Sequence, residues 1–199
     1  AGARVCHPRP VSEPTRWAFP SNMQPAPGEV RFDLKSALDS VVGLRADIPD
    51  DAFTAPILGT ERTGCGVVIG GDGLVLTIGY LITEAESIWL TANDGTVTPA
   101  HPVALDFATG LGLVMPLGPL RLPSLARGSA STIAPSDDVF VLGSGGRAHA
   151  LKATVFAKRE FAGYWEYLLE DALFATPAHP EWSGAALVGD DGRLVAASG

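Results

Sequence analysis

The chain has 199 residues, 46% of them hydrophobic and 18% charged, a composition typical of a globular protein of one domain. Its net charge of -8 and its scattered Lys and Arg residues argue against nucleic-acid binding, which needs clustered positive charge on the protein. With 23 Gly and 16 Pro, the chain favours many turns over long helices.

Residues 1–32 are predicted to be a disordered or extraneous segment, because residues 1–22 contain arginines and prolines but no apolar run. For the same reason no cleavable signal peptide is predicted there. No run in the chain reaches the ~18 apolar residues of a membrane span. If Met23 is the start of the protein, the cytoplasm is the simplest compartment to infer, and the periplasm is the alternative.

The two cysteines do not predict a disulfide framework or a cofactor site. Cys65 stands in "TGCGVVI" and is interpreted as a small buried apolar residue. Cys6 and His7 lack a second ligand pair at a useful spacing, so we expect neither a metal nor another cofactor.

The first half of the chain predicts one short helix and a series of strands. Asp33 is a plausible N-cap for a helix through Leu38, and the β-branched run that follows it, at 40–46, predicts a strand. Apolar runs on either side of Gly and Asp turns at 70–73 and 93–95 predict two hairpins.

A proline-broken connector near 118–123 separates these elements from a second series of short apolar runs. Strands that recur about every ten residues, with Gly and Asp turns between them, predict an antiparallel all-β sandwich or barrel. We therefore expect two half-domains, at 33–122 and 123–199.

A glycine-rich stretch at 143–146 offers a different interpretation, a dinucleotide-binding strand, turn and helix. Ala148 stands where that motif has its third glycine, and Thr154, Val155 and Phe156 favour a strand over a helix. The sequence favours a glycine loop between two strands.

Segments from about Ser40 to Ala197 resemble, in order, the hallmarks of trypsin-like proteases of the HtrA/Deg type. They include "GCGVVIGGDGLVLTIGYLITEAESIWL" in the first half and "PEWSGAALVGDDGRLVA" in the second. The resemblance implies one peptidase domain built as a double β-barrel of two six-stranded antiparallel barrels. In this fold another strand and a closing segment normally follow the stretch that matches "GRLVAASG". The second barrel is therefore expected to be incomplete, with an open edge available for self-association.

The resemblance also implies a degenerate catalytic triad. Ser183 takes the position of the nucleophile, but Tyr80 stands where the family has its general-base histidine, and Gly110 where it has the aspartate that orients the histidine. Glu181 replaces a glycine whose backbone forms part of the oxyanion hole in the family.

A serine hydroxyl is a poor nucleophile without a base, and a phenol of pKa near ~10 is not a suitable one. We therefore expect Ser183 to be vestigial and the protein to act by binding a peptide or protein partner. The aromatic residues Tyr164, Trp165, Tyr167 and Trp182 are expected to pack the second barrel and its loops. The alternative is that Trp182 and Glu181 shape a peptide groove beside the serine.

Two alternatives stay open at this point. The chain is an active serine endopeptidase or other hydrolase if His179, four residues before the serine, serves as a rearranged base within ~3 Å of the proton it must accept. It is a structural subunit if another chain completes its second barrel.

Overall fold

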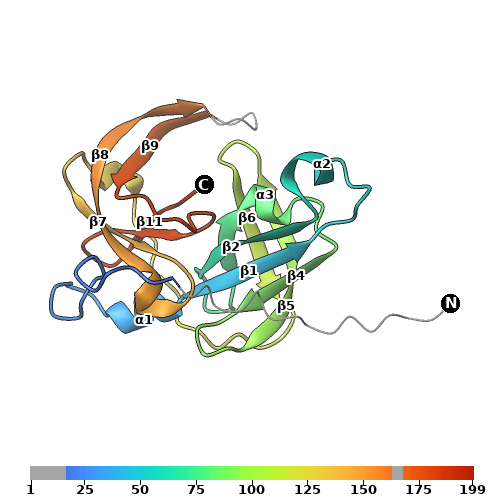
Figure 1. The fold of residues 1–199 in the computed structure, drawn as a ribbon, viewed down its shortest axis with the longest axis horizontal. Coiled ribbons are helices and arrows are strands. Elements are labelled where there is room, and N and C mark those ends of the chain that lie inside the picture. Colours follow the sequence, from blue (N-terminus) through green and yellow to red (C-terminus); the bar gives the residue numbers. More distant parts are fainter. Residues whose placement is uncertain (1–16, 163–167) are drawn as a thin grey trace.

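The computed structural model describes residues 17–162 and 168–199, which form two β-sheet halves side by side (Figure 1). The first half is a closed barrel with the strand order β1-β2-β3-β6-β5-β4. Its strands are β1 (Val41–Asp47), β2 (Glu61–Val68), β3 (Val75–Ile78), β4 (Ser87–Thr91), β5 (Val97–Asp106) and β6 (Leu111–Pro116). Three short helices accompany them: α1 (Leu34–Asp39), α2 (Ala55–Leu58) and α3 (Gly79–Ile82).

The second half is an open, five-stranded antiparallel sheet with the order β11-β10-β7-β8-β9. Its strands are β7 (Asp138–Leu142), β8 (Ala150–Ala162), β9 (Leu168–Thr176), β10 (Ala186–Val188) and β11 (Leu194–Ala197), with 3-10 turns η1 (Ala130–Thr132) and η2 (Gly146–His149). The closed barrel and the curled sheet together confirm the prediction of a trypsin-like double barrel whose second barrel is incomplete.

Local sequence signals account for most of these elements. Asp33 caps α1 as predicted, with its carboxylate accepting from the N–H of Ser36 at 3.0 Å. The predicted turns at 70–73 and 93–95 join β2 to β3 and β4 to β5. Thr154, Val155 and Phe156 lie in β8, which confirms the strand and excludes the helix of a dinucleotide-binding motif.

Strands β1 and β4 differ in whether one or both of their faces are buried. In β4 buried and half-buried residues alternate, as expected for a strand with one face on the core. In β1, residues 41–44 are all buried because α1 and the second sheet cover the face that would otherwise meet water. The side chain of Leu44 is buried inside the barrel, whereas Val41 belongs to the core between the halves.

Helix α1 lies in that shared core, although the sequence assigned it to the first half alone. Leu34 and Leu38 are buried together with Leu142 of β7 and Val188 of β10. The helix therefore contributes to the contact between the two halves, and burial of its apolar face is worth roughly 1.5–3 kcal/mol per leucine.

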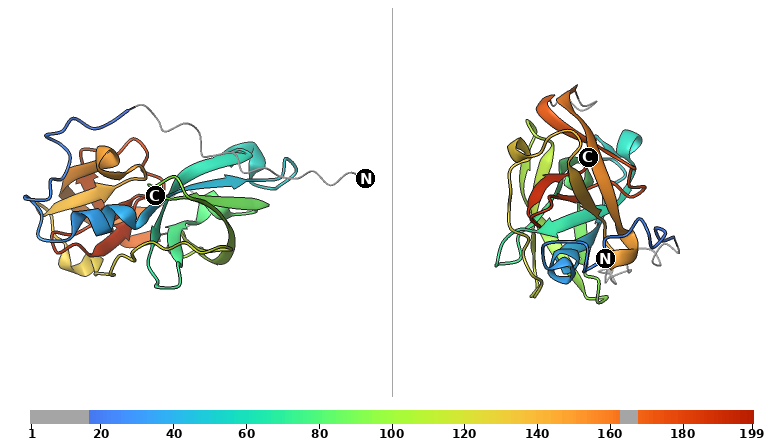
Figure 2. Two further views of the ribbon diagram at one scale, coloured as in Figure 1. Left: turned by 90° about the horizontal axis from the view of Figure 1, so that it is seen from below. Right: turned by 90° about the vertical axis from the view of Figure 1, so that its left-hand side faces the viewer.

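The segment 17–32 differs from the disorder expected for residues 1–32. It runs along the outside of the second half, drawn in dark blue in Figures 1 and 2, and Phe19 donates its N–H to the carbonyl of Ala148 at 2.9 Å. Trp17, Phe19 and Met23 supply the apolar contacts that order it. The sequence did not predict these contacts, because the three residues stand among prolines and polar residues. Residues 1–16 lie outside the described part of the chain.

Candidate functional site

Ser183 lies on the loop between β9 and β10, where main-chain bonds to the first barrel hold it. Its carbonyl accepts the N–H of Cys65 in β2 at 2.7 Å. The next residue, Gly184, has φ +77 and donates its N–H to Ser198 at 2.8 Å. A Cβ on Gly184 would lie 2.0 Å from the carbonyl oxygen of Cys65, so only glycine fits. We call residues 177–185 the serine loop.

The hydroxyl of Tyr80 is hydrogen-bonded to the hydroxyl of Ser183. Tyr80 is the second residue of α3, which begins where β3 ends in the first barrel. The structure thus brings together two residues that are 103 positions apart in the sequence and that the resemblance had paired. Either oxygen of this pair can be the donor, because both are hydroxyls.

A buried arginine supports the segment that carries Tyr80. Arg62 is 3% exposed and donates to the carbonyls of Tyr80 and Thr83 at 2.5 and 3.1 Å. It also donates to Thr54 Oγ1 at 2.7 Å, and burial lowers the pKa of its guanidinium. Because α3 is a single turn, these donors satisfy carbonyls that its own backbone leaves free. The sequence analysis missed Arg62, whose only signal was a charged residue at the start of the segment that forms β2.

Gly110 lies next to α3, in the turn between β5 and β6. Its carbonyl accepts the N–H of Gly79 at 2.8 Å, and its φ of +71 suits a glycine. Asp106 closes the same turn by accepting from the N–H of Ala108 at 3.0 Å and the hydroxyl of Thr109 at 2.7 Å. These bonds lower the pKa of Asp106 and give its carboxylate a local structural role.

His179 is 4% exposed, and both of its ring nitrogens hydrogen-bond to the main chain. Nδ1 accepts the N–H of Glu181 at 3.0 Å, so the ring proton is on Nε2, which donates to the carbonyl of His149 at 2.9 Å. Burial lowers the pKa of His179, because the charged imidazolium is disfavoured away from water. In this arrangement neither nitrogen is free to accept a proton from Ser183.

The two residues before Ser183 differ in their surroundings. The carboxylate of Glu181 accepts the indole N–H of Trp17 at 2.9 Å, a partner that the sequence did not suggest. Trp182 is 47% exposed, so its ring is available to a ligand beside the serine. The other three aromatic residues assigned to this half, Tyr164, Trp165 and Tyr167, lie outside the described residues.

Cys65 is 1% exposed, as predicted for an apolar packing residue. Burial raises the pKa of its thiol, which keeps the thiol protonated and unreactive. Its sulfur accepts the N–H of Ser144 at 3.3 Å, which ties the glycine loop at 143–146 to β2.

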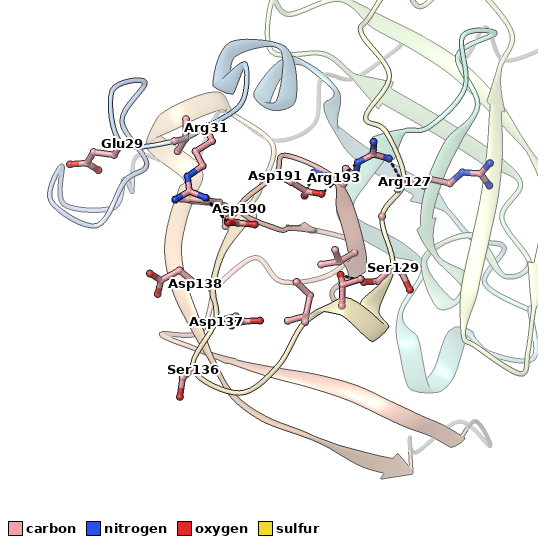
Figure 3. A pocket seen from close by; sticks show the side chains of 16 residues that line it. Glu29, Arg31, Arg127, Ser129, Ser136, Asp137, Asp138, Asp190, Asp191 and Arg193 are labelled. Atoms are coloured by element: carbon pink, nitrogen blue, oxygen red, sulfur yellow. Dashed lines mark hydrogen bonds and ion pairs between the residues drawn. The ribbon is translucent and has the colours of Figure 1, made fainter.

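A separate hollow of about 860 Å³ lies at the outer end of the second sheet (Figure 3). Asp190 and Asp191 of the β10–β11 turn line it, and they pair with Arg31 and Arg193 at 3.5 Å each. Neither Ser183 nor Tyr80 borders this hollow, so it is distinct from the serine site.

Neither a metal cluster nor a membrane helix is found in residues 17–162 and 168–199. Their His, Cys, Asp and Glu side chains do not gather in groups of three. None of their helices has the length and apolar character needed to cross a bilayer. Cys6 and His7 lie outside these residues.

A family model described as "Trypsin-like peptidase domain" matches residues 64–196. This range covers more than half of the chain and contains the serine loop and α3, so the chain belongs to the trypsin-like peptidase family. Its relatives are of the HtrA type, which confirms the resemblance seen in the sequence.

Two curated relatives and one solved structure show this likeness. The chain is 25% identical over 138 residues to a "Probable periplasmic serine endoprotease DegP-like" of Chlamydia pneumoniae, which covers 66% of this chain and 27% of the relative. It is 26% identical over 82 residues to "Serine protease HTRA1" of Xenopus laevis, covering 41% of this chain and 18% of the relative. The structure "HtrA-type protease AlgW with tripeptide" matches with a TM-score of 0.63 and 22% identity, over 81% of this chain and 50% of that one.

The chain thus spans about a quarter of the length of the first relative and half of the AlgW chain. The family model establishes the family, and the likeness to the AlgW structure shows the fold. The assignment of Tyr80 and Gly110 to triad positions stays a prediction.

Proposed function

We propose that this protein is a proteolytically inactive member of its family that binds a peptide or protein partner beside Ser183. The observation that carries the proposal is the hydrogen bond between Ser183 Oγ and the hydroxyl of Tyr80. A phenol hydroxyl is a poor general base, so it does not take the serine proton as an imidazole does. Losing the base of a serine protease costs on the order of a millionfold in rate, or about 8 kcal/mol.

The engagement of His179 weighs against an active hydrolase with a rearranged base. To act as the base, its ring would have to give up the hydrogen bonds at 2.9 and 3.0 Å and turn toward Ser183. In the proposed role Ser183 is vestigial as a nucleophile, Gly110 supplies no orienting carboxylate, and Tyr80 serves as a hydroxyl that a ligand can contact.

A fluorophosphonate probe, which modifies an activated serine, tests the absence of chemistry. We expect the wild-type protein to be labelled no more than the Ser183→Ala variant. Labelling of Ser183 that the His179→Ala substitution abolishes would overturn the proposal in favour of the alternative hydrolase.

Binding is supported by the exposed ring of Trp182, since rigid aromatic residues near a loop are good anchors for a partner. The AlgW structure carries a tripeptide, and we extend peptide binding to this chain by analogy.

An array of short extended peptides tests binding beside Ser183. We expect the bound peptides to be lost in Trp182→Ala and kept in Phe53→Ala, a matched control because Phe53 is 88% exposed in the first half. An array without bound peptides, or one on which both variants behave like the wild type, would refute peptide binding at this loop.

The open second sheet supports self-association as a further candidate. In the described residues β9 pairs with β8 on one side and ends the sheet on the other. The opposite end, at β11, is partly covered, because Leu194 exchanges hydrogen bonds of 2.8 Å with Ala126 and Gly128. An uncovered strand edge is a template for another strand, so β9 of a second copy is the candidate partner. Sedimentation at increasing concentration should show a dimer. A monomer throughout would exclude this contact and would count heavily against a structural subunit whose second barrel is completed by another chain.

A further inference from the structure

Residues 17–29 form what we call the strap, a segment without regular secondary structure that lies over the second sheet (Figure 2). It is held by hydrogen bonds along its length, which pair the main chain of Phe19 with Ala148, Met23 with Lys152, and Pro25 with the side chain of Arg147. These bonds are 2.8 to 2.9 Å long. An ion pair of 2.9 Å between Glu29 and Lys152 closes its far end. The strap is thus fixed to η2 and β8 along its whole course.

The leading end of the strap contacts the serine loop. The ring of Trp17 meets the rings of His149 and His179 edge-on, at centroid distances of 4.5 and 5.6 Å. Phe19 packs against His179 from the same segment, at 5.2 Å. Together with the indole bond to Glu181, these contacts explain why His179 is buried although it lies on a loop.

Burial under the strap fixes the hydrogen-bond partners of the His179 ring. A main-chain N–H has one hydrogen, and that of Glu181 is directed to Nδ1 of His179. The N–H of Glu181 belongs to the residue two positions before Ser183, where the family places a donor for the substrate oxygen. Here the donor is already paired, and a substrate oxygen beside Ser183 would have to break that bond to use it.

We propose that Trp17 and His179 are positioning residues that hold the serine loop in one conformation. In that conformation the N–H of Glu181 is hydrogen-bonded to His179 and is withheld from a ligand at Ser183. This inference rests on the proposed function, to which it adds a second, independent block on chemistry. Restoring a base alone would leave this block in place. A partner that displaces the strap would release both the N–H of Glu181 and the ring of His179.

Hydrogen exchange of the Glu181 amide, followed by NMR in the full chain, tests the inference. We expect Trp17→Ala and His179→Ala to speed this exchange at least about fivefold, which corresponds to the loss of one ordinary hydrogen bond. The amide of Val141 in the sheet core serves as the internal reference and should not change. Phe53→Ala and His101→Ala are the matched controls, because both residues lie away from the strap and both controls should leave the Glu181 amide protected.

His179→Asn separates a positioning role from general packing. The Oδ1 of asparagine can accept from the Glu181 N–H as Nδ1 does, so this variant should keep the protection that His179→Ala loses. Equal loss in both variants, or unchanged exchange in both Trp17→Ala and His179→Ala, would overturn the inference. Labelling of wild-type Ser183 by the fluorophosphonate would instead refute the proposed inactivity, so the two failures are distinguishable.

Discussion

Replacing Gly184 by alanine should be one of the most destabilising single changes in this chain. The new Cβ would lie 2.0 Å from the carbonyl oxygen of Cys65, whereas Cβ atoms essentially never approach another heavy atom within 3.0 Å. The residue also has φ +77, where an L side chain costs about 1–2 kcal/mol.

Relieving the overlap would move the serine loop away from β2. That movement breaks the hydrogen bonds from Cys65 N–H to Ser183 and from Gly184 N–H to Ser198, at about 1 kcal/mol each. We therefore expect Gly184→Ala to lower the free energy of unfolding by about 3–4 kcal/mol, a large share of the roughly 5–15 kcal/mol of a typical domain.

Urea denaturation of the variant, with the midpoint and slope both fitted, measures this loss. Gly71→Ala is the matched control, because a Cβ on Gly71 meets nothing within 4 Å and the substitution should be close to neutral. A cost below about 1 kcal/mol for Gly184→Ala would show that the serine loop is not tied to β2 as described.

The remaining predictions concern the supports of the site. Arg62→Met should cost about 2 kcal/mol or more in urea unfolding, because it leaves buried carbonyls without donors, whereas Arg31→Met at an 84% exposed side chain should be neutral. Tyr80→Phe should cost at most about 1 kcal/mol, since it removes one hydroxyl pair and keeps the ring. The lowered pKa of His179, whose ring faces Glu181 and His149, means that the unfolded chain binds a proton more readily than the folded one. Stability should therefore be full above pH 6.5 and fall as the pH drops through the folded pKa, and this decline should be smaller in His179→Asn.

The fold could be predicted because its signals are local and repeated. Turn residues at 70–73 and 93–95, the cap at Asp33 and the β-branched residues of β8 each match the element that forms there. The pairing of Tyr80 with Ser183 could be predicted only through the resemblance, because no local pattern connects positions so far apart. The structure now supplies their hydrogen bond.

The setting of His179 could not be predicted, because it depends on a segment with no periodic pattern. Trp17 and Phe19 stand among prolines and polar residues, where nothing in the sequence says that two rings will bury an imidazole. Only the tertiary contacts show that both ring nitrogens of His179 are hydrogen-bonded to the main chain, at His149 and Glu181. The same contacts aim the Glu181 carboxylate at Trp17.

Two different atoms of residue 183 contact the first half: its carbonyl accepts the N–H of Cys65, and its hydroxyl meets Tyr80. The first contact demands a main-chain oxygen at this point and a glycine after it, but it makes no demand for an alcohol. The requirements of shape and of reactivity at this position therefore fall on different atoms, the main-chain oxygen and the side-chain hydroxyl.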